Sequence, residues 1–110
     1  MFRVILVTAP AQEAEPLART LVRERLAACA NLVPGVRSLY WWRGKLETSG
    51  ETLLILKAPP GNVKRLMRRV TELHSYQVPE VVVLPVRDAL RAYAAWVKEE
   101  ARPGKRSRRK

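Results

Sequence analysis

The stretch that decides the fold is Val36-Arg37-Ser38-Leu39-Tyr40-Trp41-Trp42-Arg43, which the turn Gly44-Lys45 separates from a second apolar stretch at residues 51–57. β-Branched and aromatic residues between turn signals are typical of strands, so these stretches predict one long antiparallel hairpin. Side chains alternate across a strand, which puts Tyr40 and Trp42 on one face and Trp41 on the other. Both aromatic faces are buried only if helices cover one and a second subunit covers the other. The alternative is one tryptophan that stays partly exposed.

Strand and helix patterns alternate on either side of this hairpin. Strand patterns occupy residues 2–8 and 81–86, helical patterns occupy residues 13–29 and 62–73, and a last helix follows Asp88. Pro85 indicates that its strand lies at a sheet edge, and Asn62 is a suitable N-cap for the second helix. The order β-α-β-β-α-β plus a C-terminal helix predicts an α+β protein of the ferredoxin-like, split β-α-β type.

Length and composition are those of one small domain. With 110 residues, 47% of them hydrophobic, the chain can bury one core, which we assign to residues 1–100. No apolar run approaches the ~20 residues of a membrane-spanning helix. The single cysteine, Cys29, fits a reducing compartment. We therefore expect a cytoplasmic protein that does not enter a membrane.

The net charge of +11 is concentrated near the C-terminus. Residues 101–110 are rich in lysine and arginine and have little to bury, so we expect a disordered basic tail. A second basic surface is the outer face of the second helix, with Lys64, Arg65, Arg68 and Arg69. Together they predict, as an alternative function, non-specific binding of nucleic acid or another polyanion. A solvated tail and a solvated helix face explain the same charges without a partner.

The only histidine, His74, lies in Glu72-Leu73-His74-Ser75-Tyr76-Gln77-Val78-Pro79-Glu80, between the second helix and the last strand. Histidine is the commonest metal ligand, so His74 is a candidate metal site; the alternative is a residue that only caps the helix. The sequence has no glycine-rich phosphate loop and no Ser-His-Asp motif. A nucleophilic pair of Cys29 with His74 is a further alternative, although Cys29 lies in an alanine-rich segment where cysteine usually packs as a small apolar residue. We expect a protein without enzymatic activity.

Three long motifs resemble one family, the CutA divalent-cation tolerance proteins. They are Leu26-Ala27-Ala28-Cys29-Ala30-Asn31-Leu32-Val33-Pro34-Gly35-Val36, Ser38-Leu39-Tyr40-Trp41-Trp42-Arg43-Gly44-Lys45 and the segment around His74, and Tyr93-Ala94-Ala95-Trp96-Val97 matches the family's closing aromatic pattern. The resemblance runs from about residue 3 to residue 98 and leaves the basic tail outside. It implies a ferredoxin-like protomer in a homotrimer similar to the PII signalling proteins, with hairpins that pair between subunits. It also implies a role in tolerance of copper and other divalent cations, with no cofactor required.

The resemblance carries over only part of a metal site. Some members have a cysteine where this chain has Val7 and a second histidine where it has Leu73, so among imidazoles only His74 matches. Cys29 matches a family cysteine, and Gln77 stands where the family has a carboxylate. Cu(II) prefers several nitrogen and oxygen ligands. We therefore expect Cu(II) or another divalent cation at His74 only where subunits bring several imidazoles together.

The resemblance also implies clefts between subunits that hold a small ligand. The matching residues of this chain are Tyr40, Trp42, Lys57, His74, Tyr76 and Glu80. Aromatic rings with a lysine and a carboxylate suit a small anionic or zwitterionic ligand. Packing in the hairpin interface is the alternative role of Tyr40 and Trp42, and an interface ion pair is that of Lys57 and Glu80.

Overall fold

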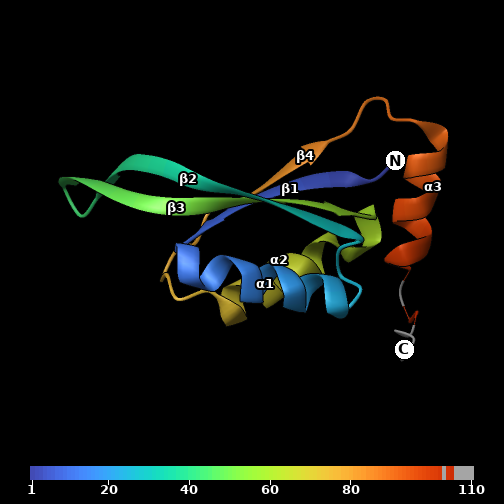
Figure 1. Ribbon diagram of the computed structural model, residues 1–110, viewed down its shortest axis with the longest axis horizontal. Coiled ribbons are helices and arrows are strands. Elements are labelled where there is room, and N and C mark those ends of the chain that lie inside the picture. The colour runs from blue at the N-terminus through green and yellow to red at the C-terminus, as the bar shows by residue number, and fades with distance from the viewer. Residues whose placement is uncertain (103, 106–110) are drawn as a thin grey trace.

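The strands of the sheet lie in the order β2-β3-β1-β4, and every neighbouring pair is antiparallel. The computed structural model describes residues 1–102, 104 and 105 (Figure 1). Its elements are β1 (Arg3–Ala9), α1 (Ala11–Arg23), β2 (Cys29–Trp42), β3 (Lys45–Ala58), a 3-10 turn (Pro60–Asn62), α2 (Val63–Leu73), β4 (Val81–Pro85) and α3 (Arg91–Glu100). This arrangement confirms the predicted α+β fold of the ferredoxin-like type. No helix in the described part of the chain is long and apolar enough to cross a membrane.

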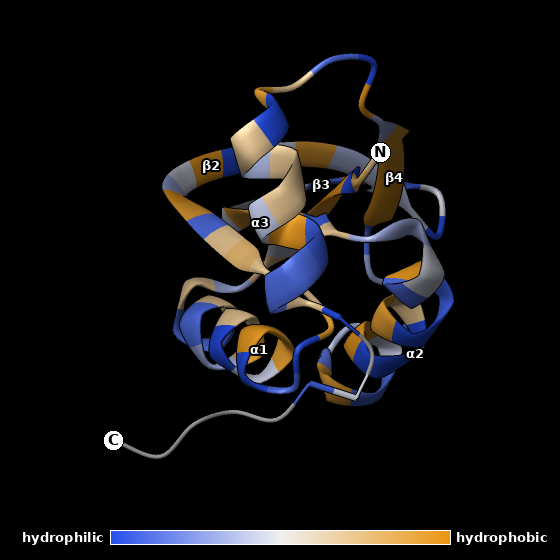
Figure 2. Ribbon diagram, turned by 90° about the vertical axis from the view of Figure 1, so that its right-hand side faces the viewer, coloured by the Kyte–Doolittle hydropathy of each residue, from blue (hydrophilic) through white to orange (hydrophobic). Residues whose placement is uncertain are grey.

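The core lies between the sheet and the two helices that cover one of its faces. Figure 1 shows α1 and α2 side by side beneath the sheet, and no helix covers the opposite face. The register pairs Ile5 with Leu56 and Val7 with Leu54, and all four side chains are fully buried against the helices. Figure 2 shows α3 across the end of the sheet, where Val97 packs in a second, smaller apolar cluster. The helices thus fix the sheet from one side and one end.

The hairpin of β2 and β3 is longer than the sequence pattern predicts, and it projects beyond the helices (Figure 1). Its two-residue loop is Arg43-Gly44, and both residues have positive φ, 50° and 80°. Such a loop has the twist of the adjoining strands. At the other end β2 continues through Gly35, whose φ of 77° accommodates a bulge between Val33 and Val36. The strand that was expected to start at Val36 therefore begins at Cys29 and contains a bulge at this point.

Helix α1 ends at Arg23, six residues before the predicted end at Cys29. Arg25 adopts φ 63°, and its amide donates to the carbonyl of Val22 at 3.0 Å while that of Leu26 donates to Leu21 at 3.1 Å. This bond pattern closes a helix C-terminus, and it is usually built on glycine. Because this position holds an arginine, the sequence did not predict that the helix ends here. As a result Cys29 begins β2 instead of ending the helix.

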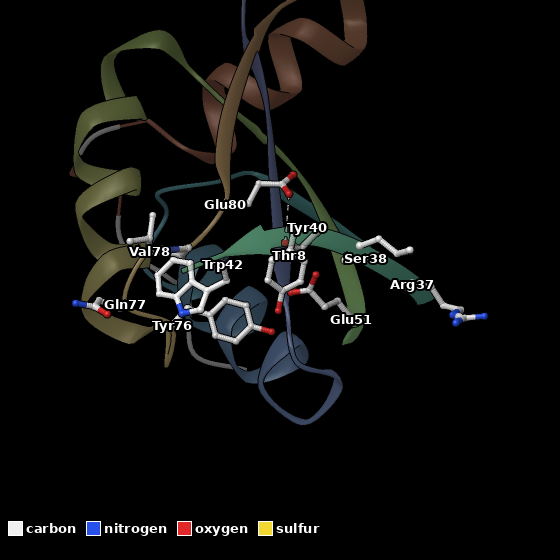
Figure 3. Close-up of a pocket in the computed structure, with 12 residues that line it drawn as sticks. Thr8, Arg37, Ser38, Tyr40, Trp42, Glu51, Tyr76, Gln77, Val78 and Glu80 are labelled. Atoms are coloured by element: carbon white, nitrogen blue, oxygen red, sulfur yellow. Dashed lines mark hydrogen bonds between the residues drawn. The ribbon is translucent and has the colours of Figure 1, made fainter. Parts of the chain in front are cut away.

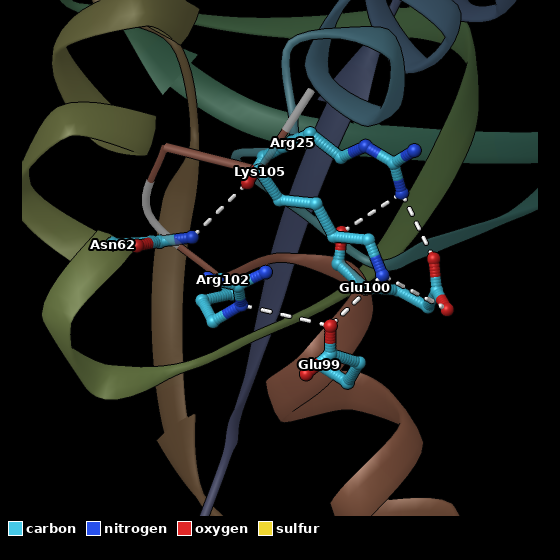
Figure 4. A network of polar contacts seen from close by, with 6 residues as sticks. All are labelled: Arg25, Asn62, Glu99, Glu100, Arg102 and Lys105. Atoms are coloured by element: carbon cyan, nitrogen blue, oxygen red, sulfur yellow. Dashed lines mark hydrogen bonds and ion pairs between the residues drawn. The ribbon is translucent and has the colours of Figure 1, made fainter. Parts of the chain in front are cut away.

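A buried polar group holds three elements together behind the sheet (Figure 4). Asn62 is fully buried, and it makes no side-chain cap on α2, contrary to the sequence prediction. Its amide nitrogen instead donates to the carbonyls of Arg25, Leu26 and Ala101, at 3.1, 3.2 and 2.8 Å. Arg25 also pairs with Glu100 at 2.9 Å. The end of α1, the start of α2 and the end of α3 are thus tied at one point.

The chain after α3 begins packed against that helix. Ala101 is fully buried, and Lys105 pairs with Glu99 at 3.0 Å. The apolar core therefore includes one residue beyond the expected boundary at residue 100. The disordered tail predicted for residues 101–110 lies partly outside the described residues, at 103 and 106–110, and there it stays a prediction.

Candidate ligand-binding site

A cavity of about 740 Å³ lies beside the hairpin, where β2 and β3 meet the end of β1 and the loop after α2 (Figure 3). Tyr40 and Trp42 reach it from β2, and Glu51 reaches it from β3. Tyr76 and Glu80 reach it from the loop between α2 and β4. Alternation along β2 puts Tyr40 and Trp42 on the same face, as the sequence predicts. Elements far apart in the sequence therefore form one aromatic and acidic pocket.

His74 holds this loop in place. Its ring is buried, with only 7% of the residue exposed, and Nε2 lies 2.7 Å from the carbonyl oxygen of Thr8. A carbonyl can only accept, so Nε2 carries the hydrogen. Nδ1 accepts a hydrogen bond from the backbone amide of Tyr76 at 3.1 Å. The neutral imidazole thus joins the end of β1 to the first turn of the loop and aims Tyr76 at the cavity.

These bonds do not leave His74 available as a metal ligand within one protomer. Both ring nitrogens are used, and a metal would have to displace one of the two backbone partners. Cys29 is at the other end of β1: it pairs in register with Lys57, which pairs with Val4. In the described part of the chain no three His, Cys, Asp or Glu residues lie close enough to hold a metal ion. The described residues of this chain therefore do not fit a Cu(II) site.

Four of the six proposed cleft residues line the cavity, whereas His74 lies behind the loop and Lys57 lies elsewhere. Tyr40, Trp42, Tyr76 and Glu80 line the cavity. The amine of Lys57 instead hydrogen-bonds to Asn31 and lies 3.9 Å from the sulfur of Cys29. The lysine that was expected to bind an anionic ligand is therefore not part of the cavity.

The sequence analysis missed Glu51 as a cavity residue. Glu51 is buried, with 6% of the residue exposed, and it stands opposite Val36 in the hairpin register. The sequence shows only that Glu51 precedes the apolar run Leu53–Leu56. A carboxylate at such a position is equally compatible with an exposed strand end. The pairing continues past the bulge at Gly35, beyond the expected strand start at Val36, so Glu51 lies inside the hairpin.

Tyr76 is the lining residue with the most perturbed ionisation. Burial raises the pKa of its phenol to about 12, and a hydrogen bond with the Glu51 carboxylate and the charge of that carboxylate add to the rise. The phenol is thus neutral at all physiological pH values. It remains a hydrogen-bond donor beside Glu51.

We expect Tyr76 to titrate well above the ordinary range of a tyrosine, with a matching loss of stability at high pH. In the unfolded chain its phenol ionises near its ordinary pKa of 10, whereas in the fold it keeps its proton up to about 12. Between these values the unfolded state binds fewer protons, so the free energy of unfolding falls as pH rises. Tyrosinate absorbance during a pH titration measures this, and Tyr76→Phe should lower the amplitude of the late transition by one tyrosine. Burial also raises the pKa of Tyr93, so the contradicting result is a late amplitude that is unchanged in Tyr76→Phe.

The tip of the hairpin is linked to the same loop. The guanidinium of Arg43 lies 5.4 Å from the centre of the Trp42 ring and donates to Oε1 of Gln77 at 3.2 Å. A cation over an indole face is an attractive arrangement. The loop is therefore held to the sheet by His74 at its start and to the hairpin by the contact of Arg43 with Gln77 near its middle.

The basic face of α2 is partly neutralised by neighbours. Arg69 pairs with Glu24 at 2.8 Å and with Glu72 at 3.2 Å, and Arg65 donates to Asn62 at 2.8 Å. Lys64 and Arg68 are exposed. This arrangement weakens the polyanion alternative, since two of the four basic groups have partners on the chain itself.

Comparisons with known proteins agree on one family. The model of the CutA1 divalent ion tolerance protein matches residues 3–100. The divalent-cation tolerance protein CutA of Thermus thermophilus is 44% identical over 100 residues, which cover 90% of this chain and 97% of that protein. The chloroplastic protein CutA 1 of rice is 43% identical over 100 residues, and this chain spans only 56% of its length.

Solved structures show the same similarity in three dimensions. The Thermus thermophilus protein superposes with a TM-score of 0.88 at 42% identity, over 91% of this chain and 98% of that one. A structure described as the PII-like protein CutA from Nostoc superposes with a TM-score of 0.86 at 39% identity, over 90% of this chain and 96% of that one. The likeness therefore covers the hairpin, the sheet and the helices together.

Proposed function

This chain belongs to the CutA1 family of divalent ion tolerance proteins, and on that basis we propose that it serves cation tolerance as a non-catalytic, homotrimeric binding protein. The proposed site is the cavity beside the hairpin, where a small ligand binds at the boundary between subunits. Relatives carry names of tolerance proteins and not of enzymes, which supports the non-catalytic part.

Exposed apolar surface supports the proposed assembly. Trp41 is 73% exposed on the projecting hairpin, next to the exposed side chains of Leu39 and Leu46. The face of the sheet without helices also exposes Val82 and Leu84 of the edge strand β4. Surfaces of this kind on a small protein usually mark an interface, and an unpaired hairpin edge invites pairing with another strand. Further copies of the same chain would bury the apolar surface and also pair with the hairpin edge.

The cavity is the observation that carries the binding role. It is large enough for a small organic molecule, and aromatic rings and polar groups converge on it from separate elements. It opens beside the exposed hairpin, so a neighbouring subunit on that hairpin would form its outer wall. The loop that completes it is held by His74 and Arg43, which supports a preformed site.

Of the two expected kinds of binding, direct Cu(II) binding at His74 is less supported than small-ligand binding in the cleft. The imidazole would first have to release Thr8 or Tyr76, and the described residues offer no second imidazole or thiolate nearby. We therefore propose that the response to divalent cations depends on the small-ligand cleft. Cytoplasmic location likewise remains a prediction, since the rice relative is named chloroplastic.

A complementation assay tests the proposal. A bacterial strain that lacks its own protein of this family is grown in rising CuCl₂ while it expresses this chain. We expect wild type to restore growth and a cavity variant, Tyr40→Ala with Trp42→Ala, to fail. Leu90→Lys, which changes an exposed apolar residue outside the cavity lining, is the control that should restore growth.

Two results would reject the proposal in different ways. Failure of the wild-type chain to restore growth at normal expression would contradict the role in cation tolerance. Full rescue by the cavity variant would separate that role from the cleft.

A further inference from the structure

We propose that the ligand of this cavity is a small organic ammonium ion. The inference rests on the proposed function, because it assigns a chemical class to the ligand of the same cleft. It departs from the sequence expectation of an anionic or zwitterionic ligand. Three features carry it: the charge of the inner wall, the rings around it and the position of the basic groups.

The inner wall of the cavity is acidic. Glu51 is almost fully buried and receives a hydrogen bond from the Tyr76 phenol, whereas Glu80 is exposed and accepts a long hydrogen bond, 3.5 Å, from the hydroxyl of Thr8. Among the described residues neither carboxylate forms an ion pair, although the chain has 21 lysines and arginines. A buried carboxylate is costly unless a cation or several donors compensate for lost solvation. A cation in the cavity supplies that compensation for Glu51.

The rings beside these carboxylates suit an alkylated cation. Figure 3 shows Tyr40, Trp42 and Tyr76 gathered on one side of Glu51. The π-face of such rings attracts ammonium groups, and aromatic cages of this kind recognise quaternary ammonium ions. The Arg43 guanidinium at 5.4 Å from the Trp42 ring shows that this ring already holds a cation of the chain itself. The phenol of Tyr76 is neutral, so it adds an aromatic ring to the site and places no second negative charge beside the Glu51 carboxylate.

The basic groups nearby do not offer an anion site. Arg37 belongs to the lining, but Figure 3 shows its guanidinium turned away from Glu51 and the rings. Lys57 is engaged with Asn31 and lies beside Cys29. A bare metal ion is disfavoured as well, because the described residues contain no set of three metal-binding side chains. An ion with one positive charge and an apolar surface matches the wall best.

Three probes of nearly equal shape and different charge test this inference. They are choline, its uncharged carbon isostere dimethylbutanol, and the anion dimethylbutyrate, each titrated by calorimetry into the full wild-type chain. We expect choline to bind at least about 10-fold more tightly than the isostere, the size of effect that a cation over rings beside a carboxylate gives. Glu51→Gln should weaken choline binding by about 10-fold, whereas Glu15→Gln, with the same change of charge on the exposed side of α1, should not.

The outcomes separate this inference from the proposed function. Equal or tighter binding of the isostere or the anion, no choline binding, or no effect of Glu51→Gln overturns the ammonium assignment. If one of the other probes binds and the cavity variant abolishes that binding, the cleft remains a ligand site of another class. Rescue of copper tolerance by the cavity variant would instead reject the proposed function itself.

Discussion

Replacement of Trp41 by lysine is expected to dissociate the proposed homotrimer into single, folded protomers. Trp41 lies on the outer face of the hairpin. Because its side chain is largely exposed, it contributes little to the stability of a single protomer. In the proposed assembly each copy buries one indole, worth roughly 2–3 kcal/mol of transfer free energy, and a buried lysine would add a desolvation cost. Sedimentation velocity should show the mass fall to one third, while circular dichroism keeps its wild-type shape.

The control for this experiment is Leu90→Lys. Leu90 is 76% exposed, in the segment before α3 and far from the hairpin, so it matches Trp41 in exposure but not in position. The Leu90→Lys protein should keep the wild-type mass. If Trp41→Lys also keeps that mass, the hairpin face is not the interface, and the exposed aromatic residues need another explanation.

Replacement of Asn62 by alanine is expected to lower the free energy of unfolding by about 3 kcal/mol, a large share of the stability of a small domain. One amide group serves three backbone carbonyls, of Arg25, Leu26 and Ala101, at a fully buried position. Its removal leaves these acceptors without that donor, and a buried acceptor without a partner costs about 1–3 kcal/mol. Urea denaturation at matched protein concentration measures the change, since assembly makes stability concentration-dependent.

Two further variants make this prediction specific. Arg65→Ala removes only the contact on the oxygen side of Asn62 and should cost less than about 1 kcal/mol, because that arginine is exposed. Asn62→Asp keeps the shape but turns the donor into an acceptor that faces three carbonyls. It should therefore destabilise at least as much as alanine at neutral pH. An Asn62→Asp protein as stable as wild type would show that the donor has no role.

The sequence predicts the layout of the fold well because its main signals are local and strong. Apolar runs such as Leu53–Leu56 and helical stripes lie between clear turn residues, which is enough to place every strand and helix in order. The predicted ends of helices and strands are wrong where a residue has a structural role that its type does not signal. Arg25 closes α1 with a positive φ, and Gly35 forms a bulge inside β2, which was expected to begin only at Val36.

The candidate site was predicted in part, and the reasons differ by residue. Tyr40, Trp42, Tyr76 and Glu80 follow from alternation and from the family motifs, and all of them line the cavity. The role of His74 was not predictable, because the Thr8 carbonyl that occupies its Nε2 is 66 residues away in the sequence. The same holds for Asn62, whose partners come from elements that meet only in the folded chain.

The most direct test of the ligand cleft uses the three tryptophans of the chain as reporters. Their indole N–H signals are followed by NMR during a choline titration of the wild-type protein. Trp42 lines the cavity, Trp41 faces the other side of the hairpin, and Trp96 lies on α3. A saturable shift of the Trp42 signal that exceeds those of Trp41 and Trp96 is the predicted result. No shift, or a shift largest at Trp96, would contradict the placement of the ligand beside the hairpin.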